Sequence, residues 1–457
     1  MRGLGACAAA VRALPPDASL TLGTTVGIIR AMFFVYEVLL YLVLILGIPF
    51  FLFRGQKLSN LRERAGFYRS AARAHDLWLH AVSVGEAIAA RPVMTAIEQM
   101  RPGTSVVITT TTITGQAQAK RMYPHATITY FPFDFTFAVR RFLDHHQPRA
   151  FATMETEIWP NVTRIAKSRG VKMLLANGRL SDRSFPRYRF AAPLLRRVLR
   201  LYDRILTRED LDRERFVAIG APREIVETSG NVKFDYEPDE TPLPIAPELS
   251  ALIANRPVLI LGSTIEGEDE MLIPELERLK DVFVIVAPRR PERFDVVASL
   301  LAKTNPVRRS TLNGAPASAG PPSPASGPER PAKGDAPSIL LLDTIGELAR
   351  MYRYATAAFV GGSLVNAGGH NPIEPAAVGV PTCFGPSMTN FREIASKLLD
   401  DHAAQQVKSA AEAIDFAQRM IDDRAAHDAM SDAARRVVAQ NRGASERTAR
   451  RIVELLA

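Results

Sequence analysis

Short apolar runs alternate with helix-length amphipathic segments along most of this 457-residue chain. In the first half, six apolar runs of strand length are each followed by polar or glycine positions, which predicts buried strands. They are Leu77–Val82, Val106–Thr111, Ile128–Pro132, Ala150–Met154, Lys172–Ala176 and Arg204–Thr207. Because the segments between them are long enough for helices, the pattern predicts βαβ units and a parallel sheet.

A stretch rich in proline and acidic residues, Tyr236–Pro247, interrupts this pattern and predicts a linker between domains. A second alternating series follows, with expected strands at Val258–Gly262, Val282–Ala287, Ile339–Asp343, Ala357–Val360 and Pro381–Phe384. We therefore expect two Rossmann-like, doubly wound α/β domains, at 54–240 and 248–457. Residues 310–337, rich in Pro, Ala, Gly and Ser, are expected to form a mobile insertion. Two such domains of similar size indicate a GT-B glycosyltransferase fold, with ligands beyond the carboxyl ends of strands.

The most hydrophobic segment, Ala31–Phe53, carries one charge, Glu37. As a helix it would be about 34 Å long, enough for a bilayer core, and we predict an N-terminal membrane-anchor helix at 31–53 after a disordered leader at 1–30. A cleaved secretory signal and a half-inserted interfacial helix are the alternatives. The five basic residues that follow it up to Arg69 predict that the remaining chain lies on the cytoplasmic side of the membrane.

The net charge of +9 favours a polyanionic partner, which can be nucleic acid, anionic lipid or a phosphorylated substrate. The chain has no zinc-finger spacing, helix-turn-helix signature or RNA-binding aromatic motif, so we expect no nucleic acid partner. Asp210 and Asp212 match a short Asp-x-Asp pattern, but they lie in a charged run that is typical of a solvated helix start. We therefore expect no metal in the site.

The two cysteines of the chain, Cys7 and Cys383, are far apart in the sequence and favour a reducing compartment.

The apolar run Ala357–Val360 leads into the stretch Gly361–Pro381, which contains several glycines and a predicted helix start at Asn371, Pro372 and Glu374. A glycine loop that leads into a helix N-terminus presents backbone N–H groups to an anion. Asn371 and Glu374 are three residues apart, so we expect them to share one helix face and bind hydroxyl groups together. The alternative is an ordinary connection whose glycines serve only the turn.

Acidic residues follow two of the predicted strands in the first domain. Glu86 comes after the first strand at an expected helix start. A plain first-turn glutamate is the commoner reason for an acid there, and its position at the expected ligand-binding edge favours a general base. Glu155 and Glu157 close another strand and can either divide acid and base roles or form structural ion pairs.

Basic residues follow several other predicted strands. Lys233 ends the first domain and either stabilises negative charge or is simply solvated. Arg289 and Arg290 lie in a proline-stiffened turn that suits a phosphate. The run Asp343–Leu348 offers backbone groups to a base or ribose, or an Asp-capped helix start. Seven arginines between Arg179 and Arg200 form a solvated face or meet anionic headgroups or a phosphorylated glycolipid.

Seven ordered motifs resemble one family, the Kdo (3-deoxy-D-manno-octulosonic acid) transferases that act on lipid A precursors. They read SVGE, METEIWPN, ANGRLSDRS, GNVKFD, APRRPERF, DTIGEL and GGHNPIEPA. The resemblance extends from residue 32 to about residue 450. It implies an inverting inner-membrane GT-B enzyme on the cytoplasmic face that needs no metal. Such an enzyme transfers Kdo from CMP-Kdo to lipid IVA in building the lipopolysaccharide inner core.

The resemblance also implies roles for individual residues. Glu86 would be the general base, and Glu155 and Lys233 would stabilise the transition state. The residues that would contact CMP are Pro288, Arg289, Ile345, Gly346, Glu347, Asn371, Pro372, Ile373 and Glu374. Ile265 departs from the family pattern, which has histidine at this place.

Two other functions are compatible with the same sequence. One is a GT-B transferase that uses a UDP-, GDP- or ADP-sugar, which a comparison of nucleotide binding would distinguish. The other is a catalytically inert, membrane-tethered lipid-binding protein, in which Glu86 would be dispensable.

Overall fold

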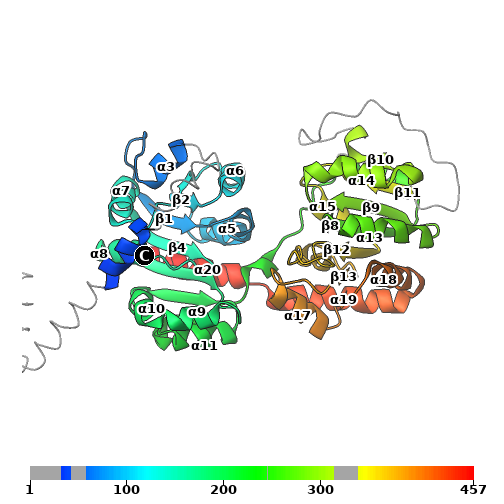
Figure 1. Ribbon diagram of the computed structural model, residues 1–457. Coiled ribbons are helices and arrows are strands. Elements are labelled where there is room, and N and C mark those ends of the chain that lie inside the picture. The colour runs from blue at the N-terminus through cyan, green and yellow to red at the C-terminus, as the bar shows by residue number, and fades with distance from the viewer. Residues whose placement is uncertain (1–31, 43–57, 244, 313–337) are drawn as a thin grey trace, which may run out of the picture. The chain divides into compact units, whose positions relative to one another are not determined.

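The computed structural model describes residues 32–42, 58–243, 245–312 and 338–457 (Figure 1). The chain divides into two compact units. The first unit contains residues up to Val232 together with Gly443–Ala457, and the second unit is Lys233–Arg442. Each unit contains a seven-stranded sheet whose strands all pair in parallel. The expectation of two doubly wound α/β domains is therefore confirmed.

The first sheet has the strand order β3-β2-β1-β4-β5-β6-β7. Chain order reverses between the central strands β1 and β4, so their carboxyl ends flank the switch point at which such sheets bind ligands. The strands are β1 (His75–His80), β2 (Val106–Thr110), β3 (Thr127–Tyr130), β4 (Pro148–Met154), β5 (Lys172–Gly178), β6 (Arg204–Thr207) and β7 (Val226–Thr228).

Helices cover both faces of this sheet, as the all-apolar strand pattern requires. Trp78 of β1 packs on one face with its ring centroid 4.2 Å from those of Phe142 and Phe151, while Leu77 and Leu79 pack on the other. The helices are α3 (Leu58–Arg64), α4 (Val84–Ala89), α5 (Arg91–Met100), α6 (Ile113–Met122), α7 (Thr136–His146), α8 (Pro160–Ser168), α9 (Phe185–Phe190), α10 (Ala192–Leu199), α11 (Asp210–Ala218) and α20 (Ala444–Leu456).

The second sheet has the order β10-β11-β9-β8-β12-β13-β14, with its switch point between β8 and β12. Its strands are β8 (Val258–Thr264), β9 (Phe283–Pro288), β10 (Val307–Arg308), β11 (Ser338–Leu341), β12 (Ala357–Val360), β13 (Thr382–Phe384) and β14 (Ala404–Gln406). Its helices are α12 (Ala246–Ile253), α13 (Glu268–Glu275), α14 (Phe294–Leu300), α15 (Leu348–Met351), α16 (Ile373–Ala377), α17 (Arg392–Asp400), α18 (Ala410–Asp422) and α19 (Arg424–Asn441).

Every strand expected from the sequence overlaps an observed strand. Three further strands were not anticipated, namely β7, β10 and β14. Each has only two or three residues, too few to show an apolar run or an alternating pattern. The buried runs of the central strands were detectable because both of their faces are covered.

The C-terminal helix α20 belongs to the first unit, whereas the sequence grouped residues 248–457 into one domain. Helix α20 packs against α5 and buries Ala449, Ile452 and Leu456 (Figure 1). Arg101 and Arg149 donate hydrogen bonds to the carbonyl oxygen of Leu456, at 2.8 and 2.7 Å. The apolar face of α20 marks it as amphipathic, but nothing in its sequence specifies which sheet it covers.

Residues 32–42 of the expected anchor are helical, and the remaining anchor residues, like the leader, lie outside the described ranges. Tyr36 donates a 2.8 Å hydrogen bond to Asp134, and Glu37 accepts hydrogen bonds from the backbone N–H and hydroxyl of Thr136. Phe33 is buried in the core of the first unit, while Phe34 and Leu39 are exposed. Within the described residues, no helix has the length and hydrophobicity needed to cross a membrane.

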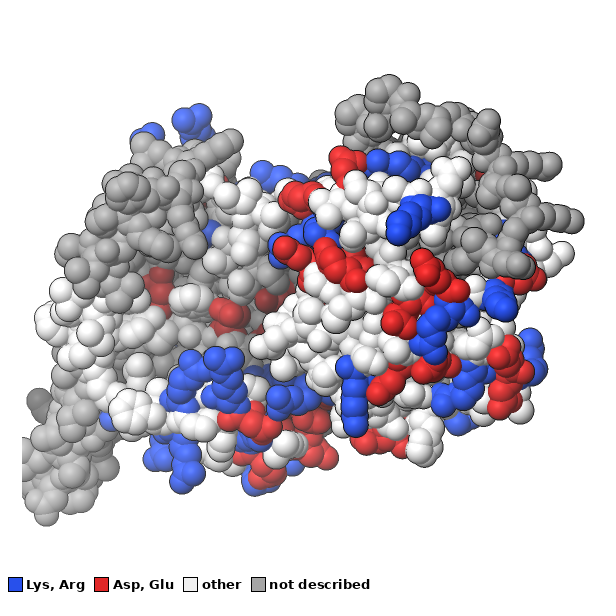
Figure 2. Space-filling model, turned by 45° about the vertical axis from the view of Figure 1, so that its right-hand side comes forward, with Lys and Arg blue, Asp and Glu red and all other residues white. Residues whose placement is uncertain are grey.

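The expected insertion at 310–337 lies largely outside the described residues. Figure 2 shows basic and acidic side chains mixed over much of the visible face of the folded units, with a group of basic side chains near its lower edge.

The packing of α20 predicts that Ile452→Ala destabilises the first unit by about 2–5 kcal/mol, the usual cost of such a cavity. Both tryptophans, Trp78 and Trp159, lie in the first unit, so the tryptophan fluorescence in a urea titration reports its unfolding. The exposed Arg450→Ala on the same helix is the control and should shift the transition by less than about 0.5 kcal/mol. An unchanged fluorescence transition in Ile452→Ala would contradict the assignment of α20 to this unit.

Candidate active site

Glu86 lies just beyond the carboxyl end of β1, in the first turn of α4. Its Oε2 accepts a 2.8 Å hydrogen bond from the backbone N–H of Val82, and its Oε1 accepts a longer one, 3.3 Å, from the hydroxyl of Ser83. The glutamate therefore folds back onto the turn that precedes its own helix. This contact fixes the carboxylate at the switch-point edge of the sheet.

The electrostatic surroundings of Glu86 favour its protonated form. Burial raises the pKa of Glu86 to about 7, and the negative charges of Glu155 and Glu157 act in the same direction. The hydrogen bonds from Val82 and Ser83 oppose this shift without cancelling it. A carboxyl group with a pKa near neutrality can both take up and release a proton at physiological pH, which is the property of a general base.

Glu155 follows β4, on the other side of the switch point. It adopts a left-handed backbone conformation with φ 59°, which is unusual for a residue with a side chain. Its Oε1 accepts a 2.6 Å hydrogen bond from Arg208, whose side chain is only 3% exposed. Arg208 also donates to the carbonyl oxygen of Asn177, at 3.2 Å. A strained residue held by a buried arginine indicates a carboxylate whose position matters.

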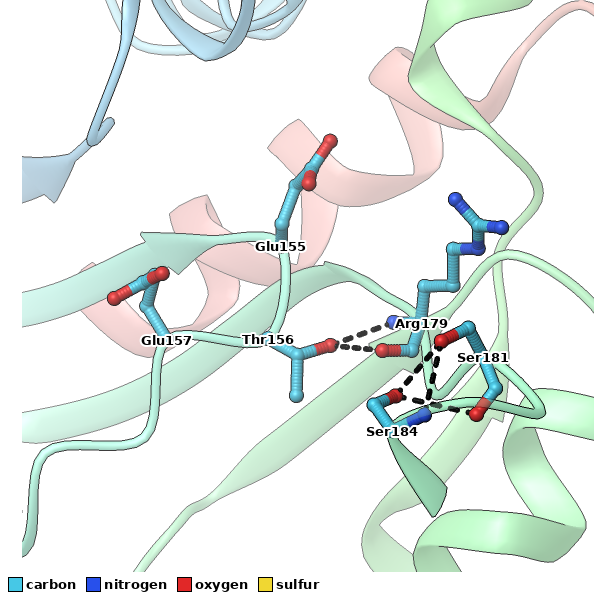
Figure 3. A pocket seen from close by; sticks show the side chains of 6 residues that line it. All are labelled: Glu155, Thr156, Glu157, Arg179, Ser181 and Ser184. Atoms are coloured by element: carbon cyan, nitrogen blue, oxygen red, sulfur yellow. Dashed lines mark hydrogen bonds between the residues drawn. The ribbon is translucent and has the colours of Figure 1, made fainter. Parts of the chain in front are cut away.

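Glu157 lies two residues further along, and burial followed by the charge of Glu155 raises its pKa. Glu155 and Glu157 line a hollow of about 210 Å³ together with Thr156, Arg179, Ser181 and Ser184. These six residues are drawn in Figure 3. The structure therefore brings Glu86, Glu155 and Glu157 close enough for their charges to interact. The arrangement can exchange a proton at Glu86 beside a second carboxylate.

Lys233, the third predicted catalytic residue, belongs to the second unit. It lies in a short 3-10 helix, Val232–Asp235, and its Nζ is 5.3 Å from the ring centroid of Phe391. This distance suits a cation–π contact.

In the second unit, the carboxylate of Glu268 binds the glycine loop that follows β12. Glu268 is fully buried and accepts hydrogen bonds from the backbone N–H groups of Gly362, Ser363 and Leu364, at 2.6, 2.7 and 2.8 Å. A fourth, at 3.3 Å, comes from the N–H of Ile265.

The expectation that this loop offers bare N–H groups to an external anion is thus wrong for residues 362–364, because a carboxylate of the chain already occupies them. Packing also requires glycine at position 361, because the Cβ of any other residue would lie 2.4 Å from the carbonyl oxygen of Ser263.

Asn371 and Glu374 share one face, as expected. Asn371 donates a 3.2 Å hydrogen bond to the Oε1 of Glu374 and accepts one from the N–H of Ile373, where helix α16 begins. Burial raises the pKa of Glu374, while the Asn371 hydrogen bond and the charge of Arg289 oppose the shift. Burial, Arg289 and Arg290 lower the pKa of His370 to about 4. Arg289 therefore acts electrostatically on the segment that contains Asn371, Pro372, Ile373 and Glu374.

The other predicted nucleotide contacts differ in accessibility. Pro288 is buried at the end of β9, and the following residue Arg289 is exposed. Ile345 is 43% exposed beside Gly346, whose φ of 93° requires glycine. The side chain of Glu347 is buried and bound to Arg309 at 2.9 Å, so a ligand would meet this turn through its backbone and through Ile345.

Sequence reasoning missed three residues that organise these sites: Arg208, Glu268 and Arg309. Each acts on a partner far along the chain, and only Glu268 had a local signal, an acid after a strand end. Among the described residues, no group of His, Cys, Asp and Glu side chains is arranged to hold a metal ion.

Comparison with known proteins identifies relatives along most of the chain. A family model described as 3-deoxy-D-manno-octulosonic-acid transferase (kdotransferase) matches residues 59–236. The 3-deoxy-D-manno-octulosonic acid transferase of Haemophilus influenzae is 34% identical over 85% of this chain and 90% of its own. The enzyme of that name from Bordetella pertussis is 36% identical over 84% of this chain and 88% of its own.

Solved structures with low sequence identity show the fold alone. A glycosyltransferase from Rickettsia africae has a TM-score of 0.52 at 12% identity, covering 85% of this chain and 98% of its own. A UDP-GlcNAc 2-epimerase from Neisseria meningitidis has a TM-score of 0.54 at 11% identity, covering 83% of this chain and 99% of its own. The paired α/β units are therefore of the GT-B type.

The role of Glu268 predicts that Glu268→Ala destabilises the second unit by about 3 kcal/mol or more, because several buried N–H groups lose their acceptor. Hydrogen exchange should accelerate at the amides of residues 362–364. Glu268→Gln keeps one acceptor oxygen and should give an intermediate effect. The exposed Glu266→Ala is the matched control. Unchanged protection of these amides in Glu268→Ala would contradict the assigned role.

Proposed function

Because this chain belongs to the 3-deoxy-D-manno-octulosonic acid (Kdo) transferase family and is therefore a glycosyltransferase, we propose that it transfers Kdo from CMP-Kdo to lipid IVA. This reaction would serve the inner core of lipopolysaccharide. The observation that carries the proposal is the Glu86 carboxyl group, whose pKa of about 7 suits a base at the switch point of the first sheet.

In the proposed reaction Glu86 removes the proton from an acceptor hydroxyl. The hydroxyl oxygen then attacks the anomeric carbon of Kdo and forms the new glycosidic bond. The bond from this carbon to the phosphate oxygen breaks, and its electron pair leaves with CMP, so the configuration inverts. A positioned base contributes a rate factor of roughly 10²–10⁴. No metal is assigned a role.

As the bond breaks, positive charge develops on the sugar and negative charge on the phosphate. The chain offers side chains that would stabilise each of these charges. The carboxylate of Glu155, oriented by Arg208, would stabilise positive charge on the sugar. Lys233 and Arg289 would hold the negative charge that gathers on the phosphate of CMP. Arg289 supports this assignment because it is exposed at the carboxyl end of β9, where parallel sheets bind ligands.

The ribose and base of CMP would be bound by the segments that surround Arg289. Asn371 and Glu374 together present an amide and a carboxyl group that suit vicinal hydroxyls. Pro372 and Ile373 shape the same segment, and Pro288, Ile345, Gly346 and Glu347 would contact CMP from two other turns. The remaining backbone groups of the Gly346 turn are suited to a base edge.

We further propose that the chain acts at the cytoplasmic face of the inner membrane through residues 31–53. Support comes from the apolar side chains that the helix at 32–42 leaves exposed: Phe34 (69%), Val35 (55%), Leu39 (54%) and Leu42 (49%). An apolar helix face of this kind can lie in the interfacial region of a bilayer.

The decisive experiment incubates the full chain with CMP-Kdo and tetraacylated lipid IVA and determines product masses. The wild type should add Kdo, and Glu86→Ala should lower the rate by at least about 10²-fold while the circular dichroism spectrum is unchanged, because the base is lost. Glu224→Gln, an exposed acid of the same unit, should transfer at the wild-type rate. Full transfer by Glu86→Ala would overturn the assignment of the base.

The raised pKa of Glu86 predicts that kcat/KM increases with pH and levels off above about pH 7, since only the ionised base accepts a proton. Glu155→Gln removes the charge of Glu155 and makes ionisation of Glu86 easier. The rise of kcat/KM should therefore occur at lower pH, whatever the change in maximal rate. Glu157→Gln should shift the rise of kcat/KM in the same direction by less, because the charge of Glu157 contributes less to the pKa of Glu86. If kcat/KM rises at the same pH in the wild type and in both variants, a group other than Glu86 titrates.

A further inference from the structure

The hollow beside the catalytic acids lies between the segments that follow β4 and β5, within the first unit. Its six lining residues come from these two segments alone: Glu155, Thr156, Glu157, Arg179, Ser181 and Ser184. Glu155 links it to the proposed base, because the Glu155 charge acts on Glu86. A group bound in this hollow would therefore sit next to the proposed reaction centre.

The two segments are cross-linked, so the hollow has a fixed floor. The hydroxyl of Thr156 accepts a 2.8 Å hydrogen bond from the backbone N–H of Arg179 and donates one to its carbonyl oxygen (Figure 3). The hydroxyl oxygens of Ser181 and Ser184 are 2.9 Å apart, and the N–H of Ser184 donates to Ser181 at 3.2 Å. These bonds hold the polar groups in place before any ligand arrives.

Arg179 is the one cation among the residues that line the hollow. Its backbone is bound to Thr156, but among the described residues its guanidinium group has no ion-pair or hydrogen-bond partner. Figure 3 shows it extending to the same side as the carboxylate of Glu155. Glu155 is already bound to Arg208, at 2.6 Å, and so does not need Arg179.

We propose that Arg179, with the hydroxyls of Ser181 and Ser184, binds an anionic substituent of the acceptor saccharide, either a phosphate or a carboxylate. The planar guanidinium fork matches both groups. One serine hydroxyl donates to the other, so the pair can supply one further donor to the ligand. The inference rests on the proposed function, which supplies an anionic glycolipid as acceptor. Binding at Arg179 holds the acceptor so that its hydroxyl is close to Glu86.

The test compares three acceptors: phosphorylated lipid IVA, the same lipid with its phosphates removed, and lipid IVA that already carries one Kdo. Arg179→Ala should raise KM roughly 10–100-fold for the anionic acceptor that uses the subsite, as expected when a charge-assisted contact of about 1.5–3 kcal/mol is lost. Its kcat should change much less, and Arg179→Lys should recover part of the loss. Arg183→Ala, an exposed arginine of the same loop outside the hollow, should leave all KM values unchanged.

The acceptors also distinguish the two sources of the anion. A rise in KM that disappears with the dephosphorylated lipid identifies a phosphate, and a rise confined to the Kdo-bearing lipid identifies a carboxylate. If Arg179→Ala changes the KM of all three acceptors equally, or changes none of them, the proposed subsite is wrong.

Equilibrium binding of phosphorylated and dephosphorylated lipid to the full chain separates this outcome from failure of the proposed function. If the wild type transfers no Kdo yet binds the phosphorylated lipid more tightly in an Arg179-dependent way, the transfer reaction fails and the subsite stands. If the wild type and Arg179→Ala bind these two lipids and the Kdo-bearing lipid with equal affinity, the subsite fails.

Discussion

The parallel pairing of each sheet is the constraint on which the candidate sites depend. When all strands run the same way, their carboxyl ends share one edge, and a reversal of strand order leaves the loops there free to diverge. In the first unit this places Glu86 after β1 and Glu155 after β4, across the switch point. In the second unit it places the Glu268 segment after β8 beside the glycine loop after β12. The chemistry is thus located by topology before any single contact is considered.

Both switch points contain a glutamate, fully buried at Glu268 and half-buried at Glu86, and the hydrogen-bond partners of the two differ. Glu268 receives four backbone N–H groups, and its carboxylate holds the loop as a structural element. Glu86 receives one backbone N–H and a longer hydroxyl contact, and it faces other carboxylates. Burial is therefore poorly compensated at Glu86, and the proton becomes exchangeable near neutral pH. The number of hydrogen-bond donors separates a carboxylate that holds a loop from one whose proton is exchangeable near neutral pH.

The sequence was informative wherever the signal was local. Apolar runs predicted the long central strands, and the positions of Glu86 and Glu155 just after β1 and β4 are confirmed, as is the contact between Asn371 and Glu374. The glycine loop was misread because its N–H groups are satisfied by Glu268, a residue more than ninety positions away. The partner of Glu155 was invisible for the same reason, since Arg208 is separated from it by two strands. Tertiary contacts of this kind leave no periodicity in the chain.

Arg208 gives the acidic cluster its electrostatic balance. Three carboxyl groups close together cannot all stay ionised without compensation, because like charges in a partly buried site repel strongly. The guanidinium of Arg208 lies 2.6 Å from the carboxylate of Glu155 and compensates its charge, and the charge of Glu155 also raises the pKa of Glu86. In the proposed reaction the two acids would differ in role: Glu155 would supply a negative charge next to an oxocarbenium-like sugar, and Glu86 would exchange the proton. A buried arginine that looks purely structural thus sets the condition under which two neighbouring acids can differ in function.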